Sequence, residues 1–411
     1  MPHDRIERIL LAELAKFEEE GRRKGEETII RGVLPPAAGR GPRFLIEGEG
    51  DKSFLRMNAN AYLGLSLQRE IRAAEERAVE SFGTGPGAVR FISGTWAPHR
   101  TLEERLAAFH RREAAMVYSS AYAAVMGLLP QLMTADTAVI SDELNHNSII
   151  NALRLGRPRE RYIYRHLNLA ELEARLVHAI PLCRRAIIVT DGIFSMRGDH
   201  APLDEIARLA QKYDSSFPEN VIVVVDDSHG VGAFGATGRG TEERTGADAD
   251  ILVGTLGKAF GVNGGYIAGG RTVIAYLRET SPFYIYSNPI APGEAAAAAA
   301  AVAFVDSAAG RELLGRLQSM AARFRAGLTD MGLETIAGDH PIVPLMLRDS
   351  ARTAAITRGL RQRGILATGL NFPVVPRGNE EIRFQICADH TAADIDEALA
   401  ALRALVQETR V

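Results

Sequence analysis

Hydrophobic residues in the middle of the chain follow two alternating patterns. Short runs that are apolar throughout lie at 115–118, 138–141, 186–190, 221–225 and 251–254. Between them, apolar residues recur at helical spacing over 102–109, 145–155, 169–177 and 203–212. Strands that are apolar on both faces and separated by helices are typical of a mainly parallel sheet covered on both sides. The pattern therefore predicts an α/β domain.

The two ends of the chain depart from this pattern. Residues 5–20 have the apolar spacing of an amphipathic helix, and the segment 35–50 is rich in Pro and Gly, which indicates an arm. After residue 287, two long helical regions lead to strands near 342–347 and 382–387 and to helices at 352–363 and 392–408. We expect an N-terminal helix and arm (1–57), a large domain (58–288) and a smaller α+β C-terminal domain (289–411).

Composition narrows the possible partners and the compartment. A net charge of −3 gives no reason to expect a nucleic acid or a membrane surface as a partner. Cys183 and Cys387 lie far apart, so a disulfide framework is not expected and a reducing cytosol fits. The N-terminus mixes acidic with apolar residues, unlike a signal peptide, and no apolar run reaches the ~20 residues of a membrane span. We therefore expect a cytoplasmic protein.

One lysine, Lys258, has a setting that favours chemistry. No other charged residue lies between Asp250 and Arg271, and glycines follow it at 261, 264 and 265. A solvated surface lysine is the ordinary interpretation of such a residue. However, an ammonium in apolar surroundings loses hydration, its pKa falls, and the free amine becomes a nucleophile or base. This is the property that a Schiff-base lysine requires.

Polar residues follow the predicted strands at their carboxyl ends, where the loops of a parallel sheet converge. The segment 119–122 leads into a helix whose first N–H groups suit a phosphate, although an ordinary serine cap explains it equally well. His146 opens another helix; it could stack on a flat ring, although a structural loop histidine is commoner. Asp226 and His229 follow the run 221–225, and a carboxylate buried there needs a partner such as a cationic ring nitrogen.

Other ligand classes fit these residues less well. Asp and His also bind metals, but there is no second cluster with ligand spacing and no HExxH motif, so we expect no metal site and disfavour a metal hydrolase. The glycine-rich segment 83–87 has no preceding strand and contains Pro86, which argues against a dinucleotide loop. A phosphate site, a stacking imidazole, an acid and a desolvated lysine are together what pyridoxal phosphate (PLP) requires.

Several motifs resemble those of the α-oxoamine synthases, which are fold-type I PLP enzymes that join an amino acid to an acyl-CoA. They lie at 60–65, 89–95, 190–196, 226–232, 254–261 and 287–288. Within the family, the segments 372–376 and 381–385 are similar to those of the glycine C-acetyltransferases. The resemblance covers the chain from about residue 55 onward. It implies an α/β fold-type I transferase that works as a homodimer with its active sites at the subunit interface.

The resemblance also implies a role for each matching residue. Lys258 would hold the cofactor covalently and remove the Cα proton, Asp226 would pair with the pyridinium nitrogen, and His146 would stack on the ring. His229 and Ser195 would contact the ring hydroxyl. The phosphate would be held by Ala121, Tyr122 and Thr255, joined by Ser287 and Asn288 of a second subunit. The substrate carboxylate would be bound by Arg383 with help from Asn60.

The reaction expected from this resemblance is the reversible condensation of glycine with a short acyl-CoA, foremost acetyl-CoA, which gives 2-amino-3-oxobutyrate and CoA. Four departures from the family pattern leave the acyl chain open: Ala61, Ala121-Tyr122, Trp96 and a short insertion at 215–220. One alternative is another α-oxoamine synthase that uses alanine or a longer acyl-CoA with decarboxylation. An aminotransferase on the same fold and a non-catalytic binder of a phosphate ligand are further alternatives.

Overall fold

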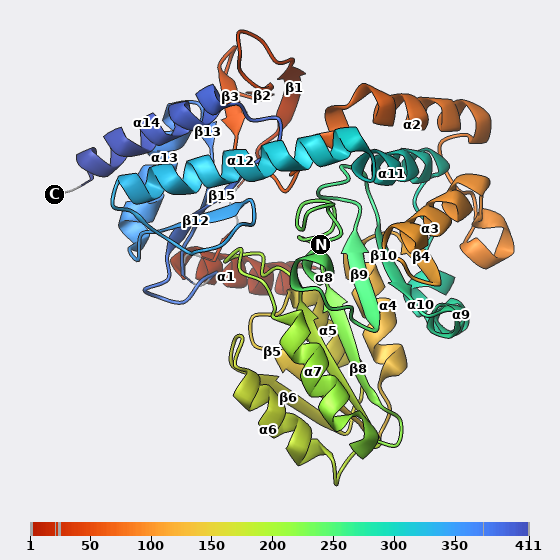
Figure 1. Cartoon of the computed structure of the whole chain (residues 1–411). Helices are drawn as coiled ribbons and strands as arrows, with labels where there is room; N and C mark the ends of the chain where they lie inside the picture. Colours follow the sequence, from red (N-terminus) through yellow and green to blue (C-terminus); the bar gives the residue numbers. More distant parts are fainter. Residues whose placement is uncertain (1–2, 21, 24–25, 373, 410–411) are drawn as a thin grey trace. The chain divides into compact units, whose positions relative to one another are not determined.

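The computed structural model describes residues 3–20, 22–23, 26–372 and 374–409 (Figure 1). Pro373, within the segment 372–376, and parts of the expected spans 1–57 and 289–411 lie outside the described residues. The chain forms two compact units, one of residues 60–318 and one of residues 1–59 with 319–411. This division differs from the boundary expected near residue 288. The reason is that α11 (Pro292–Val305) packs against α2 (Arg69–Phe82) and α3 (Ala97–Phe109).

A seven-stranded sheet in the order β4-β10-β9-β8-β7-β5-β6 forms the centre of the larger unit. Its strands are β4 (Ala114–Tyr118), β5 (Thr137–Asp142), β6 (Glu160–Tyr164), β7 (Arg185–Asp191), β8 (Val221–Asp226), β9 (Ile251–Thr255) and β10 (Gly265–Gly269). Only β10 runs against its neighbours, β4 and β9, among the described strands of this sheet. The predicted mainly parallel α/β sheet is thus confirmed.

Two strands of this sheet were not predicted, for different reasons. β6 lies at the sheet edge, where exposed residues alternate with less exposed ones, so it lacks a continuous apolar run. β10 follows a glycine-rich turn and consists of Gly265, Tyr266, Ile267, Ala268 and Gly269, so it is too short and too rich in glycine to stand out.

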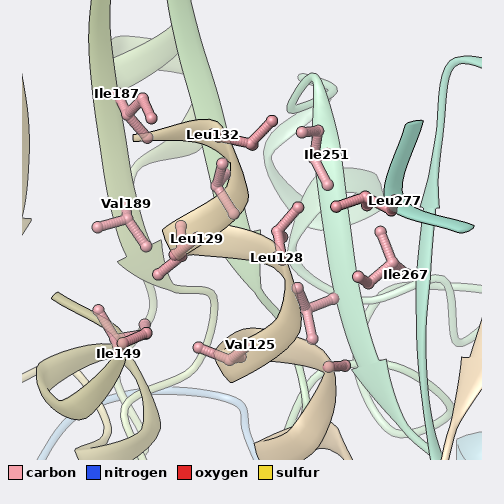
Figure 2. Close-up of a cluster of buried hydrophobic side chains, with 14 of the residues drawn as sticks. Val125, Leu128, Leu129, Leu132, Ile149, Ile187, Val189, Ile251, Ile267 and Leu277 are labelled. Atoms are coloured by element: carbon pink, nitrogen blue, oxygen red, sulfur yellow. The ribbon is translucent and has the colours of Figure 1, made fainter. Parts of the chain in front are cut away.

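One face of the sheet is covered by α4 (Ala121–Leu132), α5 (Asn147–Leu155), α9 (Arg271–Thr280) and α10 (Pro282–Ile285). Figure 2 shows Leu128 and Leu129 of α4 directed at the strands, toward Ile251 and Val189. Leu128 is fully buried. The helix is apolar on most sides because it lies between the sheet and the neighbouring helices.

Successive strand residues point to opposite faces, so residues such as Ile188 and Val225 face the other side of the sheet. There α6 (Leu169–Ala179) packs on β5 and β6, and α7 (Leu203–Tyr213) packs on β8 and on α8 (Thr241–Thr245). Helices α6 and α7 begin at the predicted residues, 169 and 203, because the apolar residues at helical spacing begin there.

The smaller unit contains two four-stranded sheets. One has the order β11-β12-β15-β14, formed by β11 (Glu334–Thr335), β12 (Ile342–Met346), β15 (Glu381–Gln385) and β14 (Thr368–Leu370), with helices α13 (Ser350–Gln362) and α14 (Ala392–Glu408). The other joins β1 (Ile30–Leu34), β2 (Arg43–Ile46) and β3 (Ser53–Arg56) to β13 (Ile365–Leu366). Together with the large domain, this α+β unit confirms the predicted fold class.

The N-terminal segment is more ordered than an arm. The segment 35–50 includes β2, and Ile46, Phe54 and Leu366 form a small core between β2, β3 and β13. The predicted first helix is α1 (Asp4–Glu19), and its apolar residues such as Ile9 and Leu10 are exposed. The long helix α12 (Ala308–Asp330) contributes to both units. No helix in the described part of the chain combines the length and the apolar character that crossing a membrane requires.

Candidate active site

A cavity of about 240 Å³ lies in the larger unit, at the carboxyl ends of β5, β7, β8 and β9. It brings together these predicted site residues: Ala121, Tyr122, His146, Ser195, Asp226, His229, Thr255 and Lys258. A larger hollow of about 770 Å³ lies at the amino ends of β8 and β9, and its lining contains none of these residues. The cavity at the carboxyl ends is therefore the candidate site, as expected for an open parallel sheet.

The start of α4 forms one wall of the cavity. Ser120 is the N-cap, and its hydroxyl accepts the N–H of Ala123 at 3.0 Å. The N–H groups of Ala121 and Tyr122 belong to the first turn, where a helix offers no carbonyl partner, and the helix dipole favours an anion there. The serine cap and the phosphate site, which the sequence left as alternatives, are thus compatible.

Gly265 allows β10 to approach this helix start. A Cβ atom at Gly265 would lie 2.1 Å from the nitrogen of Ala121. Any side chain at this position would therefore push the strand away from the N–H groups and fill the space in front of them. The close approach therefore depends on glycine at this position.

Asp226 ends β8 on the floor of the cavity and is 6% exposed. Its Oδ1 accepts the N–H of Ser228 at 3.1 Å and the Ser228 hydroxyl at 2.5 Å. A carboxylate this deeply buried is costly unless a cation or further donors satisfy it. A protonated ring nitrogen is such a partner.

Asp191 is a second buried carboxylate in the same cavity, to which the sequence analysis gave no role. It ends β7 at 4% exposure, and its Cα is paired with that of Asp226 across the two parallel strands. Burial, followed by the charge of Asp226, raises the pKa of Asp191 well above its usual value. Its carboxylate accepts the N–H of His146 at 3.1 Å. The sequence signal was present, because Asp191 follows an apolar run just as Asp226 does.

His146 is the N-cap of α5 and lines the cavity. Its Nδ1 lies 2.7 Å from the Ser148 hydroxyl and accepts the N–H of Ser148 at 3.2 Å. Burial lowers the pKa of His146; the charge of Asp226 opposes this effect and that of Lys258 adds to it. The imidazole is therefore neutral near pH 7 with its proton on Nε2, a form suited to stacking on a flat ring.

Tyr62, which lies in the motif 60–65 and had no predicted role of its own, holds His229. The hydroxyl of Tyr62 lies 2.7 Å from Nδ1 of His229 and 3.4 Å from Oδ1 of Asn60. Tyr62 is fully buried, so it fixes the imidazole of His229 in one orientation. The contact spans 167 positions of sequence, and no local pattern indicates it.

Lys258 lies half-buried in the turn between β9 and β10. The hydroxyl of Thr255, at the end of β9, accepts the N–H of Gly257 at 3.2 Å and shapes this turn. The fully buried Phe260 anchors it on the other side of the lysine. The surroundings of Lys258 are more polar than the sequence suggested, because Asp191, Asp226 and His146 line the same cavity.

The remaining predicted site residues lie outside the cavity lining. Asn60 contacts Tyr62, as described above, while Ser287 and Asn288 follow α10, and Asn288 is exposed. Arg383 lies in β15 of the smaller unit, paired with Pro344 of β12 and Thr368 of β14. Their expected roles in binding phosphate and substrate stay predictions.

Comparison with known proteins identifies the family. The model of the family "aminotransferase class I and II" matches residues 52–402. The 8-amino-7-oxononanoate synthase of Thermosipho melanesiensis is 39% identical over 94% of this chain and 95% of its own length. The mitochondrial 2-amino-3-ketobutyrate coenzyme A ligase of Bos taurus is 39% identical over 96% of both chains. The corresponding Homo sapiens enzyme is 41% identical over 88% of this chain and 84% of its own.

Solved structures agree with this result. Serine palmitoyltransferase of Sphingomonas wittichii superimposes with a TM-score of 0.88 at 27% identity, covering 99% of this chain and 98% of that one. The enzyme from S. paucimobilis with bound PLP–myriocin aldimine gives a TM-score of 0.86 at 28% identity, covering 97% of both chains.

PLP fits the donor set of the cavity. The start of α4 offers N–H groups to its phosphate, Asp226 offers a buried carboxylate to its ring nitrogen, and Lys258 offers an amine to its aldehyde. The chain belongs to the aminotransferase class I and II family and, within it, to the α-oxoamine synthases, PLP-dependent enzymes that condense an amino acid with an acyl-CoA.

Proposed function

We propose that this chain condenses glycine with a short acyl-CoA, foremost acetyl-CoA, forming 2-amino-3-oxobutyrate and CoA in a reversible reaction. The observation that carries the chemistry is the convergence of Lys258, Asp226 and His146 in one cavity. The choice of glycine is supported by the segments 372–376 and 381–385 and by relatives named 2-amino-3-ketobutyrate coenzyme A ligase.

PLP, when bound, supplies an electron sink for the pair of electrons left at the substrate Cα. In our proposal, Lys258 would hold the cofactor through its amine, and the same amine, once free, would take the Cα proton of the substrate. Asp226 keeps the proton on the ring nitrogen, because a buried carboxylate stabilises the adjacent cation. The carbon would then attack the thioester carbonyl as its C–S bond breaks, and the proton taken up by Lys258 would pass to the departing sulfur, so that CoA leaves as the thiol.

Neighbouring residues orient these groups. His146, neutral and fixed by Ser148, stacks on the ring without competing for its charge. His229, fixed by Tyr62, and Ser195 contact the ring hydroxyl. The N–H groups of Ala121 and Tyr122, together with Thr255, bind the phosphate.

Two parts of the proposal involve groups outside the cavity. Arg383, assisted by Asn60, binds the amino-acid carboxylate, for which a bidentate guanidinium is well suited. Ser287 and Asn288 reach the phosphate of a second subunit, so the active enzyme is a homodimer. Size-exclusion chromatography with light scattering tests this part, and a fully active monomer would contradict it.

The main experiment measures CoA release and product mass over a panel of amino acids and acyl-CoAs. We expect glycine with acetyl-CoA to give the highest kcat/KM. K258A should lose turnover and the visible absorption band of the bound cofactor. The matched control is K212A, which removes an exposed lysine paired with Glu173 and should behave as wild type. Normal turnover by K258A would refute the assignment.

A second candidate is condensation of alanine or use of a longer acyl-CoA with decarboxylation. The 39% identity to an 8-amino-7-oxononanoate synthase over 94% of the chain favours this second candidate. It does so as strongly as the identity to the 2-amino-3-ketobutyrate coenzyme A ligases favours glycine. Preference for alanine with release of CO₂ would identify it in the same panel. An aminotransferase would convert a 2-oxo acid without releasing CoA. The cytoplasmic location stays a prediction, and the names of two relatives place those enzymes in mitochondria.

A further inference from the structure

His166 follows β6 and contacts a carboxylate with each ring nitrogen. Nδ1 is 3.1 Å from Oδ1 of Asp142, and Nε2 is 3.2 Å from Oδ2 of Asp199. The ring also meets Phe194 edge to face, with 4.4 Å between the ring centroids. An imidazole that donates from both nitrogens is a cation. His166 itself is not part of the cavity lining.

The two carboxylates lie outside the cavity lining, in the two segments that carry His146 and Ser195 into its walls. Asp142 ends β5 and accepts the N–H of Leu144 at 2.9 Å, which shapes the turn that leads to His146. It also accepts the N–H of Leu167 at 2.9 Å, next to His166. This wall therefore positions the residue expected to stack on the cofactor ring.

Asp199 closes the loop after β7 that carries Ser195. The N–H of Phe194 donates to the carbonyl of Asp199 at 3.0 Å, and that of Gly198 donates to the carbonyl of Phe194 at 2.8 Å. Arg197 Nε donates to the Asp199 carboxylate at 2.8 Å from within the same loop. Among the described contacts of this carboxylate, the one to His166 links the loop to the wall that carries His146.

We propose that His166 is a positioning residue of the cofactor site, whose cation bridges Asp142 and Asp199 and so holds the loop of Ser195 against the turn of His146. The bridge acts before any substrate binds, because it sets the width of the slot that the ring enters. This inference rests on the proposed roles of His146 and Ser195, but not on which acyl-CoA the enzyme uses.

The charge of the bridge depends on pH. Burial alone would lower the pKa of His166, but hydrogen bonds and charges from Asp142 and Asp199 outweigh it and raise the pKa to about 9. Other charged groups nearby are Arg197, which shares Asp199, and Glu143, which accepts the N–H of His166 at 2.9 Å. Because the folded pKa exceeds the usual 6.5, the stability that the bridge contributes is fully present below pH 6.5, and the charge of the bridge is lost as the pH rises through about 9.

The test is equilibrium binding of PLP to the cofactor-free full-length chain, followed by the absorbance of the bound cofactor from pH 7 to 10. We expect H166Q to bind PLP about tenfold more weakly at pH 7.5, because the neutral amide removes the charge from the contacts to both carboxylates and the loop must be ordered on binding. The matched control is R197Q, which removes the more exposed partner of the same carboxylate and should bind within about twofold of wild type.

The pH profile separates positioning from mere stability. Wild-type affinity should show a fall centred near pH 9 that H166Q lacks. If H166Q binds PLP as wild type does and with the same pH profile, the proposal is overturned even if the variant melts at a lower temperature. Should H166Q not fold, D199N keeps the ring and removes one end of the bridge, and the same two criteria apply to it. Neither outcome depends on acyl-CoA, so the substrate proposal can fail independently.

Discussion

Replacement of Asp191 by asparagine is expected to stabilise the cofactor-free protein, by an amount that grows with pH. Asp191 is 4% exposed, and its Cα pairs with that of Asp226 in the neighbouring strand. Burial and the Asp226 charge raise the pKa of Asp191 well above the usual 3.8. Asparagine has no charge at any pH and keeps an oxygen that can accept the N–H of His146.

The sign of the effect follows from proton linkage. Between pH 3.8 and the raised folded pKa, the folded protein keeps a proton on Asp191 that the unfolded chain has lost, so wild-type stability falls as pH rises. For one titrating group, the free energy of unfolding changes by at most about 1.4 kcal/mol per pH unit. Between pH 5 and 7, D191N should therefore gain up to about 2.7 kcal/mol of unfolding free energy relative to wild type. Independently, two charges on strands about 4.8 Å apart repel by about 3.5 kcal/mol at an effective dielectric of 20.

The assay is urea unfolding of the cofactor-free wild type and D191N at pH 5, 6 and 7. Fluorescence of Trp96, the single tryptophan of the chain, reports on the larger unit. The control is the same substitution in a D226N background, where the gain should be smaller because the neighbouring charge is absent. The reasoning would be refuted if D191N raised the free energy of unfolding equally at pH 5 and pH 7, or by the same amount in the D226N background. Either result would show that repulsion between Asp191 and Asp226 does not destabilise the protein.

Three further substitutions test other buried features. E103Q should cost about 3–5 kcal/mol of unfolding free energy, because Glu103 is buried with two arginine partners and a backbone N–H donor; an unchanged urea midpoint would contradict this. G254A should lower the free energy of unfolding by about 1–3 kcal/mol, because its Cβ would lie 2.3 Å from the Tyr266 ring. The control G315A, whose Cβ would have no atom within 4 Å, should raise the free energy of unfolding by about 0.5–1 kcal/mol. Burial, with two nearby arginines, lowers the pKa of His110 to about 3. The free energy of unfolding of the wild type should therefore fall by about 4–5 kcal/mol as the pH drops from 6.5 to 3. In melting experiments at different pH values, H110Q should lose less stability than wild type over this range.

Much of the site was predictable because its residues follow apolar strands directly. Asp226 and Thr255 end strands that are buried on both faces, and His146 begins the helix after a third. In a parallel sheet the carboxyl ends of strands meet at one edge, so their order along the chain is enough to group these residues. The family motifs added the expected roles of Ser195 and His229, which stay predictions.

Contacts between distant segments were decided only by the tertiary structure. Tyr62 reaches His229, and the short strand β10 brings Gly265 against the start of α4; neither contact has a periodic signature in the sequence. The N-terminal segment was expected to be an arm, yet β3 pairs in parallel with β13 more than 300 positions later. Such pairings join residues that are far apart in the sequence, so no local pattern indicates them.

The charge states also belong to the three-dimensional structure. Asp191 and His166 are ordinary titratable residues in the sequence, and their neighbours along the chain do not set their protonation. Burial and the approach of Asp226 raise the pKa of Asp191, and two carboxylates from separate loops raise that of His166. The sequence by itself determined which chemical groups gather at the sheet edge. Distance and burial, which exist only after folding, determined which of those groups carry a proton.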